Sequence, residues 1–427
     1  MSHQKVLIVY EETGGGHEMM ANILVTILAK EPKVTIIIKT VSELVNDPVG
    51  DRLAKLWVSG WNTLIRHNLI KLADALINYL MRFTLLPIGE VSIAEPVHEA
   101  LDLIEPDILI CTADVLGKCL GTWAKERQIP YFIVITELSV FLDLVHPYAT
   151  HICYFPETVN AIRSFPLTLT YWSQDLTRSS SPRDKLRFIS NYLYEFVVCY
   201  RQNRIYCDID RHYPAQNSVR CEVIGLLREA QHFQSVERSQ LRQQLNIAPD
   251  RPCVLIISGS LGGNFCTRYL QTLQNLNLGS LTLIVACGRD KKLFETVNKI
   301  VDRTKNIEIR GLDFVDNLHQ WISAADLILA RPSAGVLLEA LLARTPLLFP
   351  RQATANDRGA IALVEKYQLG ECFECRQELL LKLTRLLDKT SYYQNKIDTF
   401  LSVYPNTFEA QSRRILQVIL SSKQENS

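Results

Sequence analysis

The stretch DLILARPSAGVLLEALLARTPLLF, residues 326–349, alternates short apolar runs with one helical pattern. The runs at residues 326–330 and 346–349 have the length of strands that are buried within a sheet. Between them, residues 336–343 form a helix that is almost wholly apolar, and Arg344 follows where it closes. Strand, helix and strand in this order are typical of parallel βαβ units. The stretch therefore predicts an α/β fold.

The same alternation continues on both sides of this stretch. Residues 228–250 interrupt it with a polar, Gln-rich segment that runs into Ala-Pro-Asp-Arg-Pro at residues 248–252, a composition typical of a domain boundary. We therefore expect two doubly wound Rossmann-like domains that face a central cleft. The strand candidates are residues 6–10, 34–38, 107–111, 131–135, 151–155 and 221–224 in the first half, and 253–257, 281–286, 307–309, 326–330 and 346–349 in the second half.

These patterns set the expected domain limits. The first domain covers residues 1–225 with an amphipathic insert near 51–95, a linker covers 226–250, and the second domain covers 251–405. Within the insert, residues 51–82 carry leucines and tryptophans on one helix side, which either faces the core or meets a membrane. Residues 165–213 are rich in Lys and Arg and either bind anionic lipid or pack. Residues 406–427 have the spacing of a final helix.

Composition excludes several classes of protein. The 427 residues suggest two or three domains, and 47% hydrophobic residues exclude a disordered chain. Lys plus Arg number 46 against 45 for Asp plus Glu, so the chain lacks the excess of positive charge that is typical of a general nucleic-acid binder. Eleven cysteines at irregular spacing, with no signal-peptide pattern, predict a reduced, cytosolic protein. Cys372 and Cys375 form one CxxC without a second pair, so we expect no zinc site.

Glycine-rich loops follow two strands and suggest binding sites. TGGGHEMMANIL, residues 13–24, places Gly15, Gly16 and His17 at a helix start, where free amide groups attract an anion. A neutral His17 imidazole there can act as a base, or the histidine can be incidental to a tight turn. The spacing fits neither the dinucleotide fingerprint nor the phosphate-binding P-loop. The weaker pattern SGSLGGNF, residues 258–265, repeats the arrangement in the second domain.

A further helix start lies at ARPSAG, where Pro332 and Ser333 are suitable first residues. Glu339, the only acid of the following helix, lies about one turn from its start. Its carboxylate can accept the two hydroxyls of a ribose, or it can be a solvated surface group.

In order along the chain, these motifs resemble those of the GT-B nucleotide-sugar glycosyltransferases. The group contains the monogalactosyldiacylglycerol synthases, the processive diacylglycerol glucosyltransferases and the peptidoglycan GlcNAc transferase. The resemblance covers most of the chain. It rests on TGGGH (13–17), EPDILICTAD (105–114), PYFIVITE (130–137), VIGLLREAQHF (223–233), VLIISGSLGG, LIVACGRDKKL and residues 311–357.

The resemblance implies a role for each matched residue. In the group, a helix start holds the diphosphate of the donor and an acidic residue binds the ribose. A base takes the proton of the acceptor hydroxyl. The implied base is His17 or Glu137, and the implied mechanism is inverting and needs no metal. The implied nucleotide-sugar residues are Phe314 and Val315 beside the uracil; Arg331, Ser333, Ala334, Gly335 and Val336 at the diphosphate; Glu339 at the ribose; Gln352 and Asn356 at the sugar; and Gly15, Gly16, Ser260, Gly262 and Gly263 along the cleft.

The resemblance implies an enzyme of glycolipid biosynthesis, cytoplasmic or membrane-peripheral on the cytosolic face. It would transfer a hexose-type sugar from a UDP-sugar, its co-substrate, to a lipid or lipid-linked acceptor, without a cofactor and without nucleic acid. The final helix would return to the first domain. Two alternatives stay open: a UDP-sugar epimerase on the same scaffold, and a non-catalytic homologue that only binds the nucleotide sugar.

Overall fold

The chain forms two compact units in the computed structural model. The first comprises residues 1–58, 74–227 and 409–427, and the second comprises residues 59–73 and 228–408. The structure describes residues 3–12, 15–45, 59–60, 63–65, 67, 69–165, 181–201, 206–207, 215, 217–234, 236–258, 264–274, 280–300 and 307–421.

The first unit contains a six-stranded, fully parallel sheet. Its strands lie in the order β2-β1-β3-β4-β6-β8, so the winding direction reverses between β1 and β3. The strands are β1 (Gln4–Tyr10), β2 (Val34–Thr40), β3 (Ile108–Cys111), β4 (Tyr131–Val134), β6 (Thr150–Cys153) and β8 (Arg220–Val223). The helices between them are α1 (Gly16–Leu28), α2 (Val41–Val45), α5 (Leu86–Ile104), α6 (Gly117–Glu126) and α7 (Pro156–Arg163).

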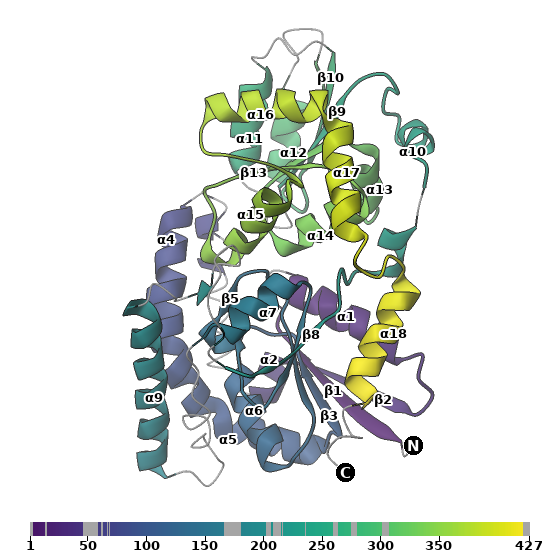
Figure 1. Cartoon of the computed structure of the whole chain (residues 1–427). Helices are drawn as coiled ribbons and strands as arrows, with labels where there is room; N and C mark the ends of the chain where they lie inside the picture. Colours follow the sequence, from purple (N-terminus) through teal and green to yellow (C-terminus); the bar gives the residue numbers. More distant parts are fainter. Residues whose placement is uncertain are drawn as a thin grey trace. The chain divides into compact units, whose positions relative to one another are not determined.

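The last helix, α18 (Phe408–Leu420), runs alongside this sheet and is drawn in yellow in Figure 1. Arg414 of α18 forms an ion pair with Glu222 of β8 at 2.8 Å. The partition into compact units likewise groups residues 409–427 with the first unit.

A helical insert follows α2. Residues 59–60 and 63–65 are helical, and helix is described again from α4 (Ile70–Ala75) through the π-helical segment η1 (Leu76–Leu85) into α5. Ile70 and Ala73 are buried whereas Leu72 and Leu80 are exposed, so leucines also lie on the outer side of the helix. Residues 51–58, where the amphipathic pattern begins, lie outside the described residues. Helix α9 (Pro182–Arg201) packs against α5.

Two short elements complete the first unit. Strand β5 (Val140–Phe141) pairs antiparallel with β7 (Tyr206–Cys207), and the 3-10 turn η2 (Leu142–Leu144) follows β5 directly. In the described part of the chain, no helix is both long enough and apolar enough to cross a membrane.

The second unit contains another parallel sheet of six strands, in the order β11-β10-β9-β12-β13-β14. The strands are β9 (Cys253–Ile257), β10 (Leu281–Ala286), β11 (Ile307–Leu312), β12 (Leu327–Ala330), β13 (Leu347–Pro350) and β14 (Gly370–Phe373). The helices are α10 (Arg238–Gln244), α11 (Asn264–Gln274), α12 (Lys291–Asn298), α13 (Leu318–Ala324), α14 (Ala334–Leu342), α15 (Ala355–Tyr367), α16 (Arg376–Asp388) and α17 (Thr390–Leu401), with the 3-10 turn η3 (Ala230–Phe233) at the start.

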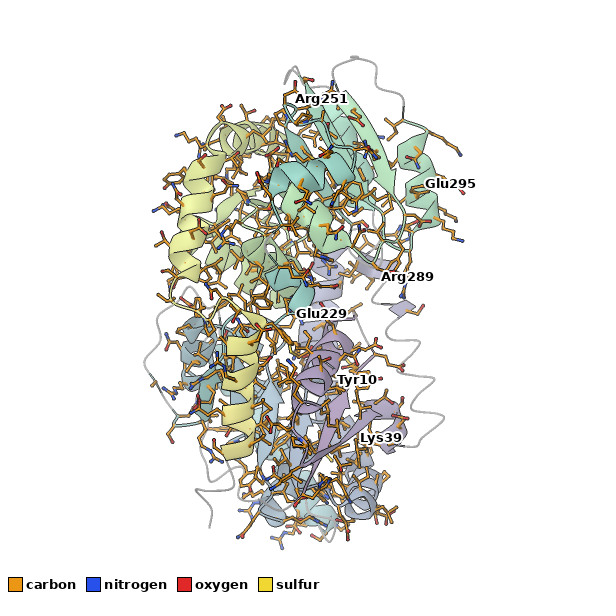
Figure 2. The ribbon with its side chains drawn as sticks, turned by 90° about the vertical axis from the view of Figure 1, so that its right-hand side faces the viewer. Tyr10, Lys39, Glu229, Arg251, Arg289 and Glu295 are labelled. Atoms are coloured by element: carbon orange, nitrogen blue, oxygen red, sulfur yellow. The ribbon has the colours of Figure 1, made fainter. Side chains whose placement is uncertain are left out.

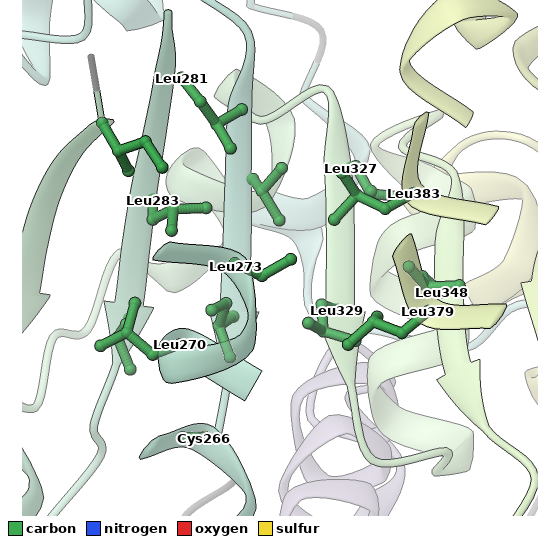
Figure 3. Close-up of a cluster of buried hydrophobic side chains, with 14 of the residues drawn as sticks. Cys266, Leu270, Leu273, Leu281, Leu283, Leu327, Leu329, Leu348, Leu379 and Leu383 are labelled. Atoms are coloured by element: carbon green, nitrogen blue, oxygen red, sulfur yellow. The ribbon is translucent and has the colours of Figure 1, made fainter. Parts of the chain in front are cut away.

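Leucines form much of the core on one face of this sheet. Figure 3 shows Leu270 and Leu273 of α11 and Leu379 and Leu383 of α16 beside strand residues such as Leu329. The alternate strand residues, which point to the opposite face, are buried too. Burial on both faces explains why these strands read as continuous apolar runs in the sequence.

The α/β prediction of two doubly wound sheets is confirmed, and every predicted strand is present within a few residues. Strand β14 was not predicted because its sequence GECF begins with glycine and includes the polar Glu371, which interrupt an apolar run. Its first residue must be glycine, since a β-carbon on Gly370 would lie 2.0 Å from the carbonyl oxygen of Leu347. The β5–β7 pair was missed because each of the two strands has only two residues.

Residues 226–250, expected as a linker, contribute to the second unit from Arg228 onward. The side chain of Leu241 in α10 is buried. Arg242 of the same helix donates to the backbone oxygen of Ala324 at 3.0 Å and pairs with Asp326 at 2.5 Å. The glutamines of this segment are exposed, but Arg238 and Arg242 of α10 bind backbone oxygens near β12, so the segment is anchored to the second unit and is more than a solvated connection.

Candidate functional site

In the second unit, α14 begins where β12 ends. Ser333 precedes the helix in an extended conformation, and its hydroxyl accepts a hydrogen bond from the Val336 amide at 3.3 Å. The helix includes Ala334 and Gly335, so it begins two residues before the predicted start. Arg331 lies just before it, with Nε 3.6 Å from Asp357 Oδ2. A cation and the amides of a first helical turn together favour an anionic ligand.

Glu339 lies in the middle of α14 and is no solvated surface group, since its side chain is only 19% exposed. Arg228, which is 1% exposed, places Nε 3.7 Å from Glu339 Oε1. The same guanidinium donates to the Ala334 carbonyl oxygen at 3.5 Å. Burial raises the pKa of Glu339 and the negative Glu229 adds to this, while Arg228 and His232 act in the opposite direction. Glu339 is thus a shielded acceptor whose charge depends on its cationic neighbours.

Sequence reasoning did not single out Arg228. It lies in the segment GLLREAQHF, quoted above only for its resemblance, and Glu229 follows it (Figure 2). An arginine at the end of a domain carries no local sign that it will be buried. Its partner is 111 positions away along the chain, so only the fold brings the two together.

The other expected donor residues of this unit follow strands β11 and β13. Phe314, just after β11, is 52% exposed, and the guanidinium carbon of Arg289 (labelled in Figure 2) lies 5.1 Å from its ring centroid. Gln352 is exposed after β13. Asn356 lies in the first turn of α15, and its Oδ1 is buried without a hydrogen-bond partner among the described residues. The half-buried Val315 follows Phe314.

These loops share one edge of the sheet because the carboxyl ends of parallel strands coincide there. The edge therefore combines an exposed aromatic ring, a helix start, an inward carboxylate and amide side chains. Ser260, Gly262 and Gly263, expected on the same edge after β9, lie outside the described residues.

In the first unit, His17 lies in the first turn of α1. Gly15 precedes the helix with φ 77°, a left-handed conformation that glycine adopts without strain, and Gly16 is the first helical residue. The His17 side chain is buried, and its Nδ1 lies 2.6 Å from the carbonyl oxygen of Thr112. Because a carbonyl only accepts, Nδ1 carries the proton, and Nε2 of the neutral ring keeps its lone pair. Thr13 and Gly14 of the same loop lie outside the described residues.

Acidic groups surround this imidazole. Nε2 lies 3.8 Å from Asp114 Oδ2, just after β3. Burial lowers the pKa of His17, but Asp114, Glu11 and Glu137, together with the Thr112 carbonyl, raise it, and the net shift is upward. The arrangement makes His17 more basic than an ordinary buried histidine.

The loop after β4 reaches the same imidazole. Thr136 Oγ1 lies 3.3 Å from His17 Nδ1, and the half-buried Glu137 follows it in sequence. The structure therefore brings both expected catalytic residues, His17 and Glu137, to one place.

Asp114 is a functional candidate that sequence reasoning quoted within EPDILICTAD without assigning it a role. An acid directly after a buried strand was the available signal. The backbone nearby is strained: Leu116, fully buried, has φ 68° immediately before α6. Such strain in a residue with a β-carbon is frequent at functional sites.

Among the residues that the structure describes, no group of three or more His, Cys, Asp or Glu side chains is arranged to hold a metal ion.

Comparison with known proteins agrees with the resemblance drawn from the sequence. Residues 253–389, most of the second unit, match the glycosyltransferase family 28 C-terminal domain, so the chain carries such a domain.

Distant relatives include three kinds of enzyme. The chloroplastic monogalactosyldiacylglycerol synthase of Spinacia oleracea is 26% identical over 37% of this chain and 31% of its own length. The N-acetylglucosamine transferase acting on pyrophosphoryl-undecaprenol of Acinetobacter baylyi is 31% identical over 33% and 38%. The processive diacylglycerol beta-glucosyltransferase of Staphylococcus carnosus is 19% identical over 39% and 42%. The matched segments thus span less than half of each relative.

Solved structures match over the whole chain. MurG of Acinetobacter baumannii has a TM-score of 0.59 at 16% identity, covering 98% of this chain and 99% of that one. The calicheamicin glycosyltransferase CalG4 has a TM-score of 0.58 at 14% identity, covering all of both chains. At these identities the likeness establishes the fold, which is GT-B.

Proposed function

We propose that the chain is an inverting glycosyltransferase that moves a hexose-type sugar from a UDP-sugar to a lipid or lipid-linked acceptor. The observation that carries the proposal is His17, a buried imidazole that keeps one basic nitrogen and is surrounded by carboxylates. The family 28 domain match and the relatives' names support the reaction class.

The second unit binds the donor in this proposal. The first turn of α14, with Arg331, holds the diphosphate, because helix amides and a cation compensate its charge without a metal. Glu339 accepts the ribose hydroxyls, while Gln352 and Asn356 face the sugar. The buried Asn356 Oδ1 supports this role, since a sugar hydroxyl is a donor that would satisfy it.

The first unit supplies the base. His17 Nε2 takes the proton of the acceptor hydroxyl as its oxygen attacks the anomeric carbon. The bond between that carbon and the diphosphate oxygen breaks, and UDP leaves with the electron pair. Asp114 stabilises the imidazolium that forms, because a carboxylate at 3.8 Å favours the charged ring. Glu137 adds negative charge near the ring. Because its own carboxylate can also accept a proton, it is the second candidate for the base.

A lipid acceptor is supported by the surface of the first unit as well as by the relatives' names. Leu80 of η1 is exposed, and so is Leu186 of α9, which has the exposed Arg183 and Arg187 on either side. Apolar and basic side chains on one helix suit the interface of an anionic membrane. In this proposal the enzyme acts at a membrane surface, on the cytosolic face that the resemblance implies.

Calorimetric titration with UDP, GDP and ADP tests the donor half. We expect UDP to bind with micromolar affinity and the Glu339→Ala variant to lose that binding. Glu295→Ala is the matched control, since Glu295 is an exposed acid on α12 of the same unit (Figure 2). If none of the three nucleotides binds to the native protein, the proposal fails at its first step.

Turnover assays separate the alternatives. UDP-glucose, UDP-galactose and UDP-N-acetylglucosamine are incubated with and without diacylglycerol vesicles, and the anomeric coupling of any glycolipid is measured by NMR. An inverted linkage supports the proposal, whereas a retained one contradicts the mechanism. Epimerised donor without acceptor would favour the epimerase, and UDP binding without any turnover would favour the non-catalytic homologue.

A further inference from the structure

The loop that follows β4 contacts His17 at one end and two buried cations at the other. Thr136, near its start, lies 3.3 Å from His17 Nδ1. At its far end, Arg82 from η1 forms an ion pair with Asp143, and its guanidinium carbon lies 3.6 Å from the Phe141 ring centroid. Arg82 is 5% exposed, so the ion pair is almost completely shielded from water.

Lys118 is the second buried cation and is 2% exposed. Its Nζ donates to the Leu142 carbonyl oxygen at 2.9 Å and to the Val145 carbonyl oxygen at 2.6 Å. It lies in the first turn of α6, four residues after Asp114. The 3-10 turn η2 is therefore fixed by a charged side chain from each of two helices.

Burying charged side chains in this way adds little net free energy to the stability of a fold. Moving two ions out of water costs several kcal/mol each, roughly, and their attraction often no more than balances it. Apolar side chains of similar size often stabilise a buried position as well as an ion pair does. What directional charged contacts add is a defined position for the backbone they hold. Arg82 also lies in a π-helical segment, a departure from α-helix that occurs frequently at functional sites.

We propose that Arg82 and Lys118 are positioning residues, which fix the loop of residues 136–146 so that Thr136 and Glu137 keep their places beside His17. The proposal rests on the proposed function in that His17 is taken as the base. Arg82 and Lys118 touch no substrate in this account and act only through the loop.

The test uses the ring of His17 itself, in the whole protein without substrate. The charges facing that ring are Glu11 after β1, Asp114 after β3 and Glu137 after β4. In Arg82→Met, the loosened loop holds Glu137 less closely, so we expect a lower His17 pKa by NMR titration of the histidine rings. His17→Gln identifies the His17 signal.

Arg127→Met is the matched control. Arg127 also pairs with an aspartate, Asp102 at 2.5 Å, and lies over an aromatic ring, Trp123 at 4.7 Å to the centroid. It follows the last turn of α6, whereas Lys118 lies in the first. We expect this variant to keep the native His17 pKa and activity.

Kinetics provide a second readout. For Arg82→Met we expect kcat to fall roughly tenfold, because a small misplacement of catalytic groups is costly, with UDP affinity unchanged. Arg82→Lys, which keeps the charge, should recover part of kcat. A folded Arg82→Met protein with native His17 pKa and native kcat would overturn the proposal.

If Arg82→Met fails to fold, a double variant tests the proposal instead. Arg82→Met combined with Asp143→Leu replaces the ion pair by apolar side chains and leaves no unpaired charge buried. If this folded double variant keeps native kcat and His17 pKa, the proposal is wrong. The titration needs no glycosyl transfer: absent turnover in the native protein would refute the proposed function, while the pKa shift would still decide the positioning role.

Discussion

The Nε2 atom of His17 lies 3.8 Å from Asp114 Oδ2, while the Nδ1 atom of the same ring donates to the Thr112 carbonyl oxygen. One nitrogen is therefore occupied by the backbone, and the other faces a carboxylate. This arrangement orients the ring and stabilises its charged form, which are the two requirements for a base that must gain a proton during the reaction.

Removing the imidazole should abolish most of the activity without affecting the donor site. For His17→Gln we expect kcat to fall by about 10² to 10⁴, the usual contribution of a general base. UDP affinity, measured by calorimetry, should stay within twofold of native because Glu339 and α14 belong to the other unit. Loss of UDP binding together with kcat would indicate a structural role for His17 instead.

Neutralising Asp114 should change the pH dependence of the reaction. The neutral form of His17 is the active base, so activity rises as the pH increases through its pKa. Asp114 raises that pKa, and Asp114→Asn should therefore move the acid limb of the profile of kcat against pH to lower pH. The plateau should fall as well, since the imidazolium loses its partner. Asp102→Asn, on α5, is the control and should leave the limb in place.

Protein stability should carry the same signature. The pKa of His17 is higher in the folded chain than its ordinary value near 6.5. This higher pKa stabilises the folded protein. The stabilisation is fully present at a pH below the ordinary pKa and is lost as the pH rises through the pKa of the folded state. The difference in free energy of unfolding between native protein and His17→Gln should therefore shrink from pH 5.5 to pH 8.5 in urea titrations. A difference that grows with pH would mean that burial outweighs the carboxylates.

Arg228 should set the pH range in which UDP binds. Burial raises the pKa of Glu339, and Arg228 opposes that rise. UDP affinity should weaken as the pH falls and Glu339 becomes protonated, because a neutral carboxyl group is a poorer acceptor. In Arg228→Met this weakening should begin at higher pH, as followed by calorimetry between pH 5 and pH 8. Arg251→Met, a half-exposed arginine near β9, should bind UDP as the native protein does.

The architecture was predictable because it depends on local patterns. Buried parallel strands read as apolar runs, and residues 326–349 alone predicted the βαβ order that the second unit repeats. His17 and Glu339 could be singled out because glycine loops and helix starts mark the carboxyl ends of strands. Strand β14 escaped because its sequence GECF begins with glycine and includes the polar Glu371, so it shows no apolar run.

Pairings between distant residues were not predictable. Asp114 and His17 are 97 positions apart, and Arg228 and Glu339 are 111 apart, so no local pattern relates them. The same holds for Arg82, whose partner Asp143 lies 61 residues further along the chain. A buried charge acquires its role from the partner that the fold supplies, and one sequence does not contain that information in local form.

The most direct test of the central claim is transfer itself. Native protein and His17→Gln are incubated with each radiolabelled UDP-sugar and diacylglycerol vesicles, and label in the lipid fraction is measured. The account predicts that one UDP-sugar labels the lipid with native protein and that the label falls at least roughly a hundredfold with the variant. Equal labelling by both proteins, or none with any donor although UDP binds, would contradict it.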